Sequence, residues 1–180
     1  MTAIKPIAGM TYLGDATPFV PRLREIIQTI QLFSDFETAD LECLARHMRV
    51  LRAEPGTTII REGEDGDYML LILSGNCEIS RRDMVGVGAQ IAIAGPGKTL
   101  GEMALIDGEP RFANCVTLEQ VEFAVLDREQ LSLMITEQPL VGVKLLMEFL
   151  MQVNQRLRDT TNQLMTCIET QRRKEREAKR

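Results

Sequence analysis

The sequence predicts an α+β fold, mainly β, in which an antiparallel jelly-roll barrel lies between N-terminal helices and a long C-terminal helix. Short apolar runs between residues 48 and 127 are separated by turns of Gly, Pro and acidic residues. Turns about every 8–12 residues are typical of antiparallel sandwiches and barrels. The segments on both sides of this region instead repeat apolar residues at helical spacing.

Length and composition favour one compact domain with extensions. The chain has 180 residues, 44% of them hydrophobic, which is enough for one sizeable core. No apolar run approaches the roughly 18 residues that a membrane-spanning helix needs. The first residues also lack the charged and apolar blocks of a signal peptide. We therefore expect a cytoplasmic protein without membrane insertion.

The cysteines indicate neither disulfides nor a metal site. Four cysteines are scattered along the chain without a Cys-x-x-Cys pair, and His47 is the only histidine. Reduced thiols in packed or half-exposed positions are the simplest interpretation. We expect no metal, no cofactor and no catalytic residue. A metal enzyme on a barrel of this kind would need clustered histidines.

The first part of the chain predicts an irregular leader followed by two helices. Residues 1–21 contain several Gly and Pro residues and little periodicity. Pro21 suits the first position of a helix, and a second helix is expected from Thr38 to His47. Together these helices would form a lid at the start of a domain over residues 22–137. The apolar positions that repeat at helical spacing are Ile26, Ile27, Ile30 and Phe33 in the first helix, and Leu41, Leu44, Ala45 and Met48 in the second.

The predicted strands follow the runs between turns. Their expected bounds are Thr57 to Arg61, Tyr68 to Leu73, Cys77 to Arg82, Gln90 to Ala94, Asn114 to Thr117, and Val121 to Leu126.

The C-terminal part predicts a short helix and then one long helix. Asp127 is a plausible N-cap for a helix over Arg128 to Thr136, and Pro139 can open a helix that continues to the C-terminus. This long helix, with a basic tail, defines a second region over residues 138–180. Residues 172–180 carry six basic and two acidic side chains.

A heptad pattern on the long helix predicts a parallel homodimer. Apolar and small residues recur at alternating steps of four and three. A seam of this length is longer than packing on one small barrel requires. The seam positions are Leu146, Leu150, Val153, Leu157, Thr160, Leu164 and Cys167.

The stretch from Gly95 to Asn114 contains the candidate ligand site. Glu102 opens a short apolar segment that can form a single helical turn, and Arg111 follows after a Gly/Pro reversal. The free N–H groups of a helix start attract an anion. A carboxylate and a guanidinium beside such amides could grip a ligand that has both a hydroxyl and a phosphate.

This stretch resembles the phosphate-binding cassette of the cyclic-nucleotide-binding domains, including the catabolite activator proteins. Here it reads Leu100-Gly101-Glu102-Met103-Ala104-Leu105, followed by Pro110-Arg111-Phe112-Ala113. The resemblance implies that Glu102 accepts the ribose 2′-hydroxyl, that Arg111 pairs with the cyclic phosphate, and that the backbone from Gly101 to Ala104 cradles its oxygens. Phe112 departs from the family pattern, in which a small or hydroxylic residue is frequent, and Ala113 completes the motif.

The resemblance extends over residues 30–165. It includes Arg156-Leu157-Arg158-Asp159-Thr160-Thr161, which is similar to the run that places hydroxyls against the adenine in the catabolite activator proteins. By this resemblance Thr160 and Thr161 would complete the site from the dimer helix. The other positions that carry it are Gly56, Ile60, Glu62, Gly63, Asp67, Met69, Ile72, Gly75, Gly95, Pro96 and Gly97.

The resemblance favours cyclic AMP over cyclic GMP as ligand. Relatives tuned to cyclic GMP often place Thr beside the cassette arginine, whereas Phe112 offers no hydroxyl. Cyclic di-GMP stays open as an alternative, although the relatives that bind it have lost the glutamate that is retained here as Glu102.

We therefore expect a stand-alone, non-enzymatic receptor for cyclic AMP that signals through its dimer helix to an unidentified effector protein. The 20 residues after Thr160 are mostly one charged helix, so we expect no DNA-binding domain and no sequence-specific DNA binding. One alternative is a dimeric scaffold that has lost its ligand.

A second alternative is a P-loop triphosphatase. Residues 92–99 fit a relaxed phosphate-loop pattern that ends in Lys98 and Thr99. The strict motif needs Gly where this chain has Ala92, and Gly108 and Pro110 leave little room for the helix that should follow.

Overall fold

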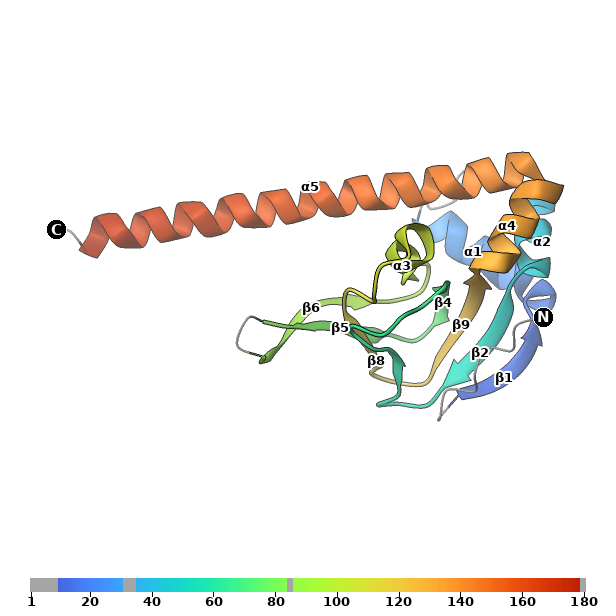
Figure 1. Cartoon of the computed structure of the whole chain (residues 1–180), viewed down its shortest axis with the longest axis horizontal. Coiled ribbons are helices and arrows are strands. Elements are labelled where there is room, and N and C mark those ends of the chain that lie inside the picture. Colours follow the sequence, from blue (N-terminus) through green and yellow to red (C-terminus); the bar gives the residue numbers. More distant parts are fainter. Residues whose placement is uncertain (1–9, 31–34, 84–85, 179–180) are drawn as a thin grey trace. The chain divides into compact units, whose positions relative to one another are not determined.

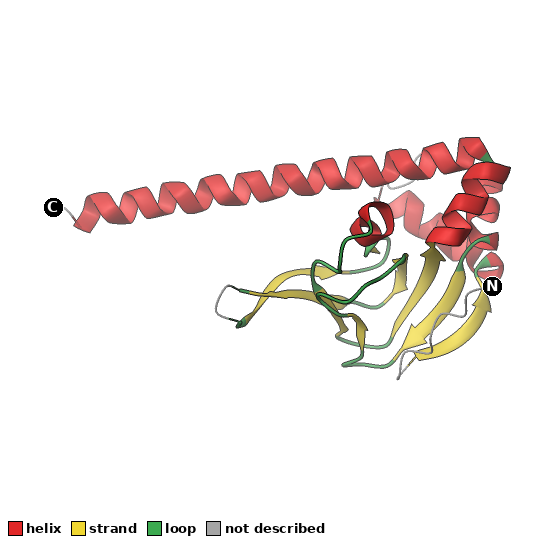
Figure 2. Cartoon of the chain, in the orientation of Figure 1, coloured by secondary structure: helices red, strands yellow, loops and turns green. Residues whose placement is uncertain are grey.

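The computed structural model describes residues 10–30, 35–83 and 86–178, and the chain divides into two compact units, residues 1–144 and 145–180. The first unit contains all the strands and most of the helices, and the second is the greater part of one helix (Figures 1 and 2). Within the described ranges, no helix combines the length and apolar character needed to cross a membrane.

Two antiparallel sheets confirm the predicted mainly β jelly-roll architecture. The five-stranded sheet has the order β1-β2-β9-β4-β7, with bounds Met10–Asp15, Arg49–Ala53, Val121–Asp127, Tyr68–Ser74 and Thr99–Leu100. The four-stranded sheet has the order β3-β8-β5-β6, with bounds Thr58–Ile60, Asn114–Thr117, Cys77–Arg82 and Gly88–Ala94.

The core lies between the inner faces of these sheets. Strand β9 shows how the sequence produces it: Val121, Phe123 and Val125 alternate along the strand, so their side chains share one face. Burying such side chains stabilises the fold by about 1.5–3 kcal/mol each. The remaining members of the core cluster are Leu51, Ala53, Ile59, Ile60, Leu70, Ile72, Cys77, Ala94, Leu100 and Cys115.

The helices of the first unit are α1 (Val20–Ile30), α2 (Thr38–Arg46), α3 (Glu102–Asp107) and α4 (Arg128–Glu137), with a 3-10 turn, η1, at Thr17–Phe19. The predicted N-cap of α4 is confirmed, because the Asp127 carboxylate accepts a 2.8 Å hydrogen bond from the Gln130 N–H. The predicted buried face of α2 is also confirmed, since Leu41, Leu44 and Ala45 are buried. Of the first predicted helix, Phe33 lies outside the described residues.

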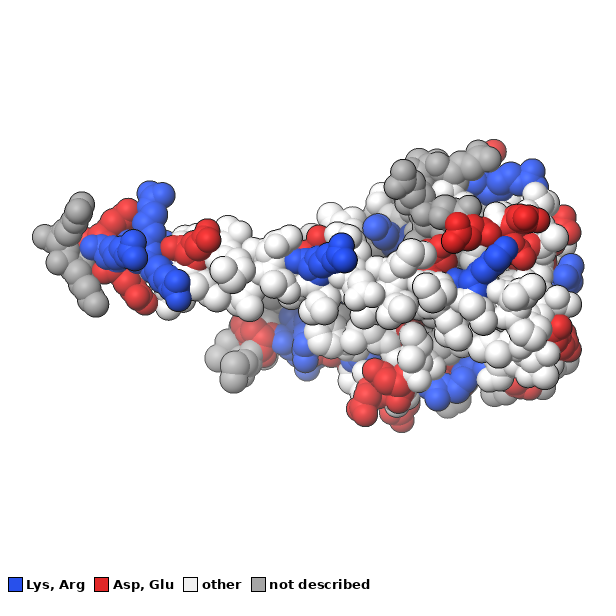
Figure 3. Space-filling model, turned by 90° about the horizontal axis from the view of Figure 1, so that it is seen from above, with Lys and Arg blue, Asp and Glu red and all other residues white. Residues whose placement is uncertain are grey.

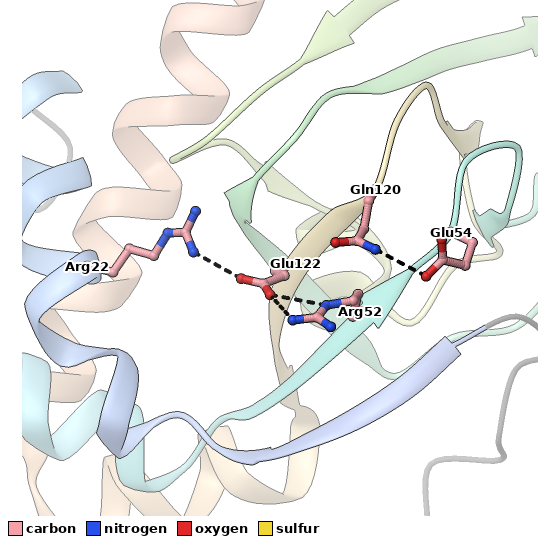
Figure 4. A network of polar contacts seen from close by, with 5 residues as sticks. All are labelled: Arg22, Arg52, Glu54, Gln120 and Glu122. Atoms are coloured by element: carbon pink, nitrogen blue, oxygen red, sulfur yellow. Dashed lines mark hydrogen bonds and ion pairs between the residues drawn. The ribbon is translucent and has the colours of Figure 1, made fainter.

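A carboxylate on β9 connects α1 to the five-stranded sheet (Figure 4). Glu122 accepts hydrogen bonds from Arg22 of α1 at 2.9 Å and from Arg52 of β2 at 2.7 Å. Nearby, the Gln120 amide donates to Glu54 at 3.2 Å. This hydrogen bond connects the start of β9 to the end of β2. Two cations on one half-buried carboxylate therefore fix the helix against the sheet.

The prediction of an irregular leader was wrong for residues 10–15, which form β1. This strand pairs with β2 from Met10↔Ala53 to Asp15↔Arg49, with a bulge between Tyr12 and Gly14. Gly14 has φ 123°, and the bulge accommodates it without ending the strand. Pairing with β2 outweighs the local turn propensity of Gly14. Residues 1–9 lie outside the described ranges.

The boundary between the two compact units falls inside the long helix that was predicted for residues 138–180. Helix α5 (Pro139–Ala178) does begin at Pro139, but its first residues belong to the first unit. Gly142 lies so close to Ile135 that an added Cβ would be 2.7 Å from Ile135 Cγ1. Lys144 Nζ also forms a 2.6 Å ion pair with Asp40 of α2. The second unit therefore starts at Leu145.

The second unit is one helix that is mostly exposed after Phe149 and ends in a charged segment. Figure 3 shows few charged side chains along the middle of α5 and a concentration of both signs near its end. Among the last residues, Arg173 pairs with Glu177 at 2.9 Å. The predicted heptad positions Leu150, Leu157 and Leu164 are all exposed in the single chain.

Candidate functional site

The cassette folds as a left-handed turn followed by the short helix α3. Gly101 has φ 79° and caps the helix, and Gly108 has φ 76° and ends it. At the start of α3 the Leu105 N–H donates to the Gly101 carbonyl at 3.2 Å. The amides of residues 102–104 precede that bond, so the helix supplies them no partner of its own.

Gly101 allows Arg111 to approach the cassette. The Arg111 guanidinium donates from Nη1 to the Gly101 carbonyl at 2.9 Å. A side chain at residue 101 would overlap Nη1 and would lie 3.2 Å from the Tyr68 carbonyl. Both the positive φ and the space around it therefore require glycine. This contact places Arg111 against the residue that precedes Glu102.

Arg111 and Glu102 are both buried. Arg111 is 4% exposed and Glu102 is 1% exposed. Buried charged groups are retained when they are paired or when they act on a ligand. Arg111 Nη2 is buried and has no hydrogen-bond partner among the residues that the structure describes. One donor of the guanidinium is thus available to an anion, which fits a phosphate.

Two residues that the sequence analysis missed surround the guanidinium. The Arg111 Cζ atom lies 4.3 Å from the centroid of the Tyr68 ring, at the start of β4. Gly66, in the loop before β4, lies so close that an added Cβ would overlap Nε and Nη2 of Arg111. Burial raises the pKa of the Tyr68 hydroxyl, although the Arg111 charge opposes this shift, so the ring is neutral near pH 7.

The rest of the cassette divides into buried and exposed positions. Ala104 is buried, and its carbonyl accepts a 2.9 Å hydrogen bond from Arg128 of α4. Met103 is exposed on the outer face of α3, and Ala113 is half-buried. Met103 and Ala104 were predicted to face the anion through their backbone N–H groups. Their apolar side chains form no polar contact.

Phe112 is 50% exposed and carries a cation on its ring. The Arg81 Cζ atom of β5 lies 4.0 Å from the ring centroid. Arg81 also pairs with Glu62 at 3.8 Å, and Glu62 accepts a 3.4 Å hydrogen bond from Asn114. Phe112 therefore contacts a polar cluster beside the cassette. No local spacing in the sequence indicated that Arg81 would lie there.

Thr160 and Thr161 lie on α5 in the second unit, and both are exposed. The Thr161 hydroxyl donates to the Leu157 carbonyl at 2.8 Å within the helix. The cassette belongs to the first unit, so the predicted contribution of these hydroxyls to the same site stays a prediction.

The phosphate-loop alternative does not fit the observed backbone. Residues 95–98 form a turn in which the Lys98 N–H donates to the Gly95 carbonyl at 3.1 Å. Thr99 is buried and pairs with Leu71 as part of β7. The helix that follows, α3, ends at Asp107. A phosphate loop instead leads into a sustained helix of a parallel sheet.

A family model described as "Cyclic nucleotide-binding domain" matches residues 50–138, which contain the cassette. A curated relative is the "CRP-like cAMP-activated global transcriptional regulator" of Mycobacterium tuberculosis, 30% identical over 146 residues. That alignment covers 81% of this chain and 63% of the relative, so this chain spans less than two thirds of the regulator's length.

Solved structures of cyclic-nucleotide-binding domains are also similar to this chain. A cyclic nucleotide-binding domain from Methylobacillus flagellatus is 32% identical with a TM-score of 0.81, and the match covers 87% of this chain and 88% of that one. The regulatory domain of Toxoplasma gondii PKA, crystallised with cAMP, is 27% identical with a TM-score of 0.57, over 64% of this chain and 44% of that one.

Proposed function

Because this chain belongs to the cyclic nucleotide-binding domain family, we propose that it is a receptor for cyclic AMP that passes its signal to a separate protein. The observation that carries the proposal is the buried guanidinium of Arg111, which has one donor, Nη2, without a partner in the described structure. A cyclic phosphodiester carries one negative charge, and a charge-assisted hydrogen bond from arginine recognises it well.

The proposed ligand contacts follow the cassette. Arg111 pairs with the phosphate, and the N–H groups of residues 102–104 donate hydrogen bonds to its other oxygens. Glu102, which is buried beside Gly101, accepts the ribose 2′-hydroxyl. Cyclic AMP is preferred to cyclic GMP because Phe112 provides no hydroxyl for guanine. Cyclic AMP is also named for the mycobacterial relative and the Toxoplasma structure.

The proposed output is a parallel homodimer formed through α5. Leu150, Leu157 and Leu164 are exposed in the single chain and are spaced by seven residues. Exposed leucines on one helical seam are stabilised by a second helix with the same seam. In this arrangement Thr160 and Thr161 would reach the base, and ligand binding would favour one arrangement of the dimer helices. The effector protein would read that arrangement.

We further infer that the chain has no enzymatic activity and acts in the cytoplasm. Three of its four cysteines are buried and none forms a disulfide, which is typical of a reducing compartment. The regulatory action would then consist of binding alone.

Isothermal titration of the dimer with cyclic AMP, cyclic GMP, cyclic di-GMP and ATP–magnesium tests this function. Arg111→Ala should weaken cyclic AMP binding by about 100-fold, because removing one partner of a buried charge pair costs about 2–5 kcal/mol. Lys98→Ala is the control, since Lys98 is exposed and outside the cassette, and it should bind normally. The triphosphatase alternative would be supported instead if the wild-type chain hydrolysed ATP and Lys98→Ala lost nucleotide binding.

The other outcomes separate the remaining alternatives. If cyclic di-GMP bound more tightly than cyclic AMP, the ligand of this receptor would be cyclic di-GMP. Absence of heat with every nucleotide would mean that the domain is a dimeric scaffold.

A further inference from the structure

The guanidinium of Arg111 is held from several sides by residues of the chain itself. Its Nη1 donates to the Gly101 carbonyl at 2.9 Å, and its Cζ lies 4.3 Å from the Tyr68 ring centroid. The backbone of Gly66 lies against Nε, Cζ and Nη2. The Arg111 backbone is also fixed, because its N–H donates to the Glu64 carbonyl and its carbonyl accepts from the Gly63 N–H, both at 2.9 Å.

These contacts leave the Nη2 amino group open. Nη1 is used by Gly101, and the guanidinium is packed against an aromatic ring and a glycine that has no side chain. Nη2 has no hydrogen-bond partner within the described structure. A flexible arginine would lose rotamer freedom on binding a phosphate, and this loss weakens binding. A guanidinium that is already fixed avoids most of that loss.

We propose that Tyr68 and Gly66 are positioning residues that hold Arg111 in its phosphate-binding geometry before the ligand arrives. This inference rests on the proposed function, because it explains how that same site binds a cyclic phosphodiester. Tyr68 acts through the face of its ring, by attraction between the cation and the π system. Gly66 acts through the absence of a side chain.

The ring, and not the hydroxyl, should carry the effect of Tyr68. The hydroxyl donates a long 3.4 Å hydrogen bond to the Ile59 carbonyl, and the Arg111 charge also acts on it. Tyr68→Phe keeps a ring over the guanidinium and should bind cyclic AMP within about threefold of wild type. Tyr68→Leu fills similar space without a π face and should bind about tenfold more weakly.

Gly66→Ala gives an independent test from the opposite side. A Cβ at residue 66 would overlap Nε and Nη2 of Arg111, so the guanidinium must move. This variant should lose most of its cyclic AMP affinity. Gly88→Ala is the matched control, because a Cβ at Gly88 meets nothing within 4 Å and its φ, like that of Gly66, is not positive. Tyr12→Leu is the matched control for Tyr68→Leu, because Tyr12 is exposed on β1.

Two measurements on the full chain decide the proposal. Isothermal titration gives the affinity of each folded variant for cyclic AMP, with thermal unfolding to compare stability. Proton–nitrogen NMR of the Arg111 Nε–H, assigned by its loss in Arg111→Ala, reports the guanidinium without any ligand. The Tyr68 ring should shift this signal to high field, and the shift should persist in Tyr68→Phe and vanish in Tyr68→Leu.

The outcomes separate this inference from the proposed function. Normal affinity of Tyr68→Leu, or an Arg111 signal that is the same in Tyr68→Leu and wild type, would overturn the positioning role. If the wild-type chain bound no cyclic nucleotide, the proposed function would fail, and the NMR comparison would still decide whether Tyr68 positions Arg111. Equal losses in Tyr68→Leu and Tyr12→Leu would also count against it.

Discussion

Arg128, the first residue of α4, donates a 2.9 Å hydrogen bond to the carbonyl of Ala104 in the cassette helix α3. The two residues are 24 positions apart in the chain, and their contact fixes α3 against the helix that follows the barrel. The proposed phosphate-binding amides lie in the same short helix. Its position therefore depends on a side chain outside the motif.

Arg128→Ala should weaken cyclic AMP binding by about tenfold, because a hydrogen bond from a charged donor contributes about 1.5–3 kcal/mol. The barrel should remain folded, since Arg128 is exposed. Isothermal titration of Arg128→Ala beside Arg61→Ala, another exposed arginine, tests this. Equal affinities in the two variants would show that the contact with Ala104 does not support the site.

Gly101→Ala should destabilise the domain more than Gly56→Ala. Both glycines have positive φ, so alanine is strained at either position by about 1–2 kcal/mol. A Cβ at Gly56 meets nothing within 4 Å, whereas one at Gly101 would overlap Arg111 Nη1. Denaturant unfolding should therefore show a further loss of at least about 1 kcal/mol for Gly101→Ala. Equal losses would mean that Arg111 moves away at no cost.

Cys167 should form a disulfide between two chains if α5 forms the parallel dimer. It is the exposed cysteine among four, and it occupies a predicted seam position. Equivalent seam residues in a parallel pair lie close enough to be bridged. Mild oxidation should therefore give a covalent dimer on a non-reducing gel.

The control for this experiment is Cys167→Ser, which should stay monomeric on the gel. Cys43, Cys77 and Cys115 are buried, and burial raises the pKa of Cys77 to about 11, which keeps it a thiol near pH 7. Leu157→Glu should abolish the cross-link and give a monomer in sedimentation. A Leu157→Glu variant that remained dimeric would refute the α5 interface.

The Asp40–Lys144 pair should stabilise the fold only within a pH window. Burial alone would raise the pKa of Asp40, but hydrogen bonds from Lys144 and from the Glu37 N–H hold it below its usual 3.8. The hydrogen bond to Asp40 raises the pKa of Lys144 above 10.5. The contribution of the pair is thus present between these values, is lost as pH falls through the Asp40 pKa, and is lost as pH rises through the Lys144 pKa.

Thermal unfolding of wild type and Lys144→Met across pH tests this window. The difference in Tm should be largest between about pH 5 and pH 9 and should shrink in acid. Lys98→Met, at an exposed lysine in a turn, should show no such difference. A Tm difference that stays constant down to pH 2 would show that packing of the Lys144 chain matters more than its charge.

Several elements could be predicted from the sequence because their signals are local. β5 and β8 begin and end where their Gly-, Pro- or acid-bounded runs do, and α4 starts after the Asp127 cap. β1 and β7 could not be predicted in this way. β7 has two residues, Thr99 and Leu100, and exists because they pair with Leu71 and Leu70 of β4. Such pairing depends on the folded sheet, and no local pattern encodes it.

The candidate site also contains residues that the local sequence identifies and residues that only the fold brings together. Glu102 and Arg111 could be identified because one compact motif contains both, and the structure places Arg111 against Gly101. Tyr68 lies 43 positions before Arg111, and it reaches the guanidinium through the pairing of β4 with β7 and β9. The role of Gly66 depends on empty space, which no residue type reveals. Distant contacts of this kind require the structure.

The pairing of β1 with β2 also bears on how the protein should be produced. β1 lies at the edge of the five-stranded sheet, so a truncated version beginning at Val20 would leave the N–H and C=O groups of β2 uncovered. Uncovered edges recruit strands from other chains and cause aggregation. Affinity tags are therefore better followed by the complete β1 segment, and insoluble material from shorter versions would reflect this edge and not a defective ligand site.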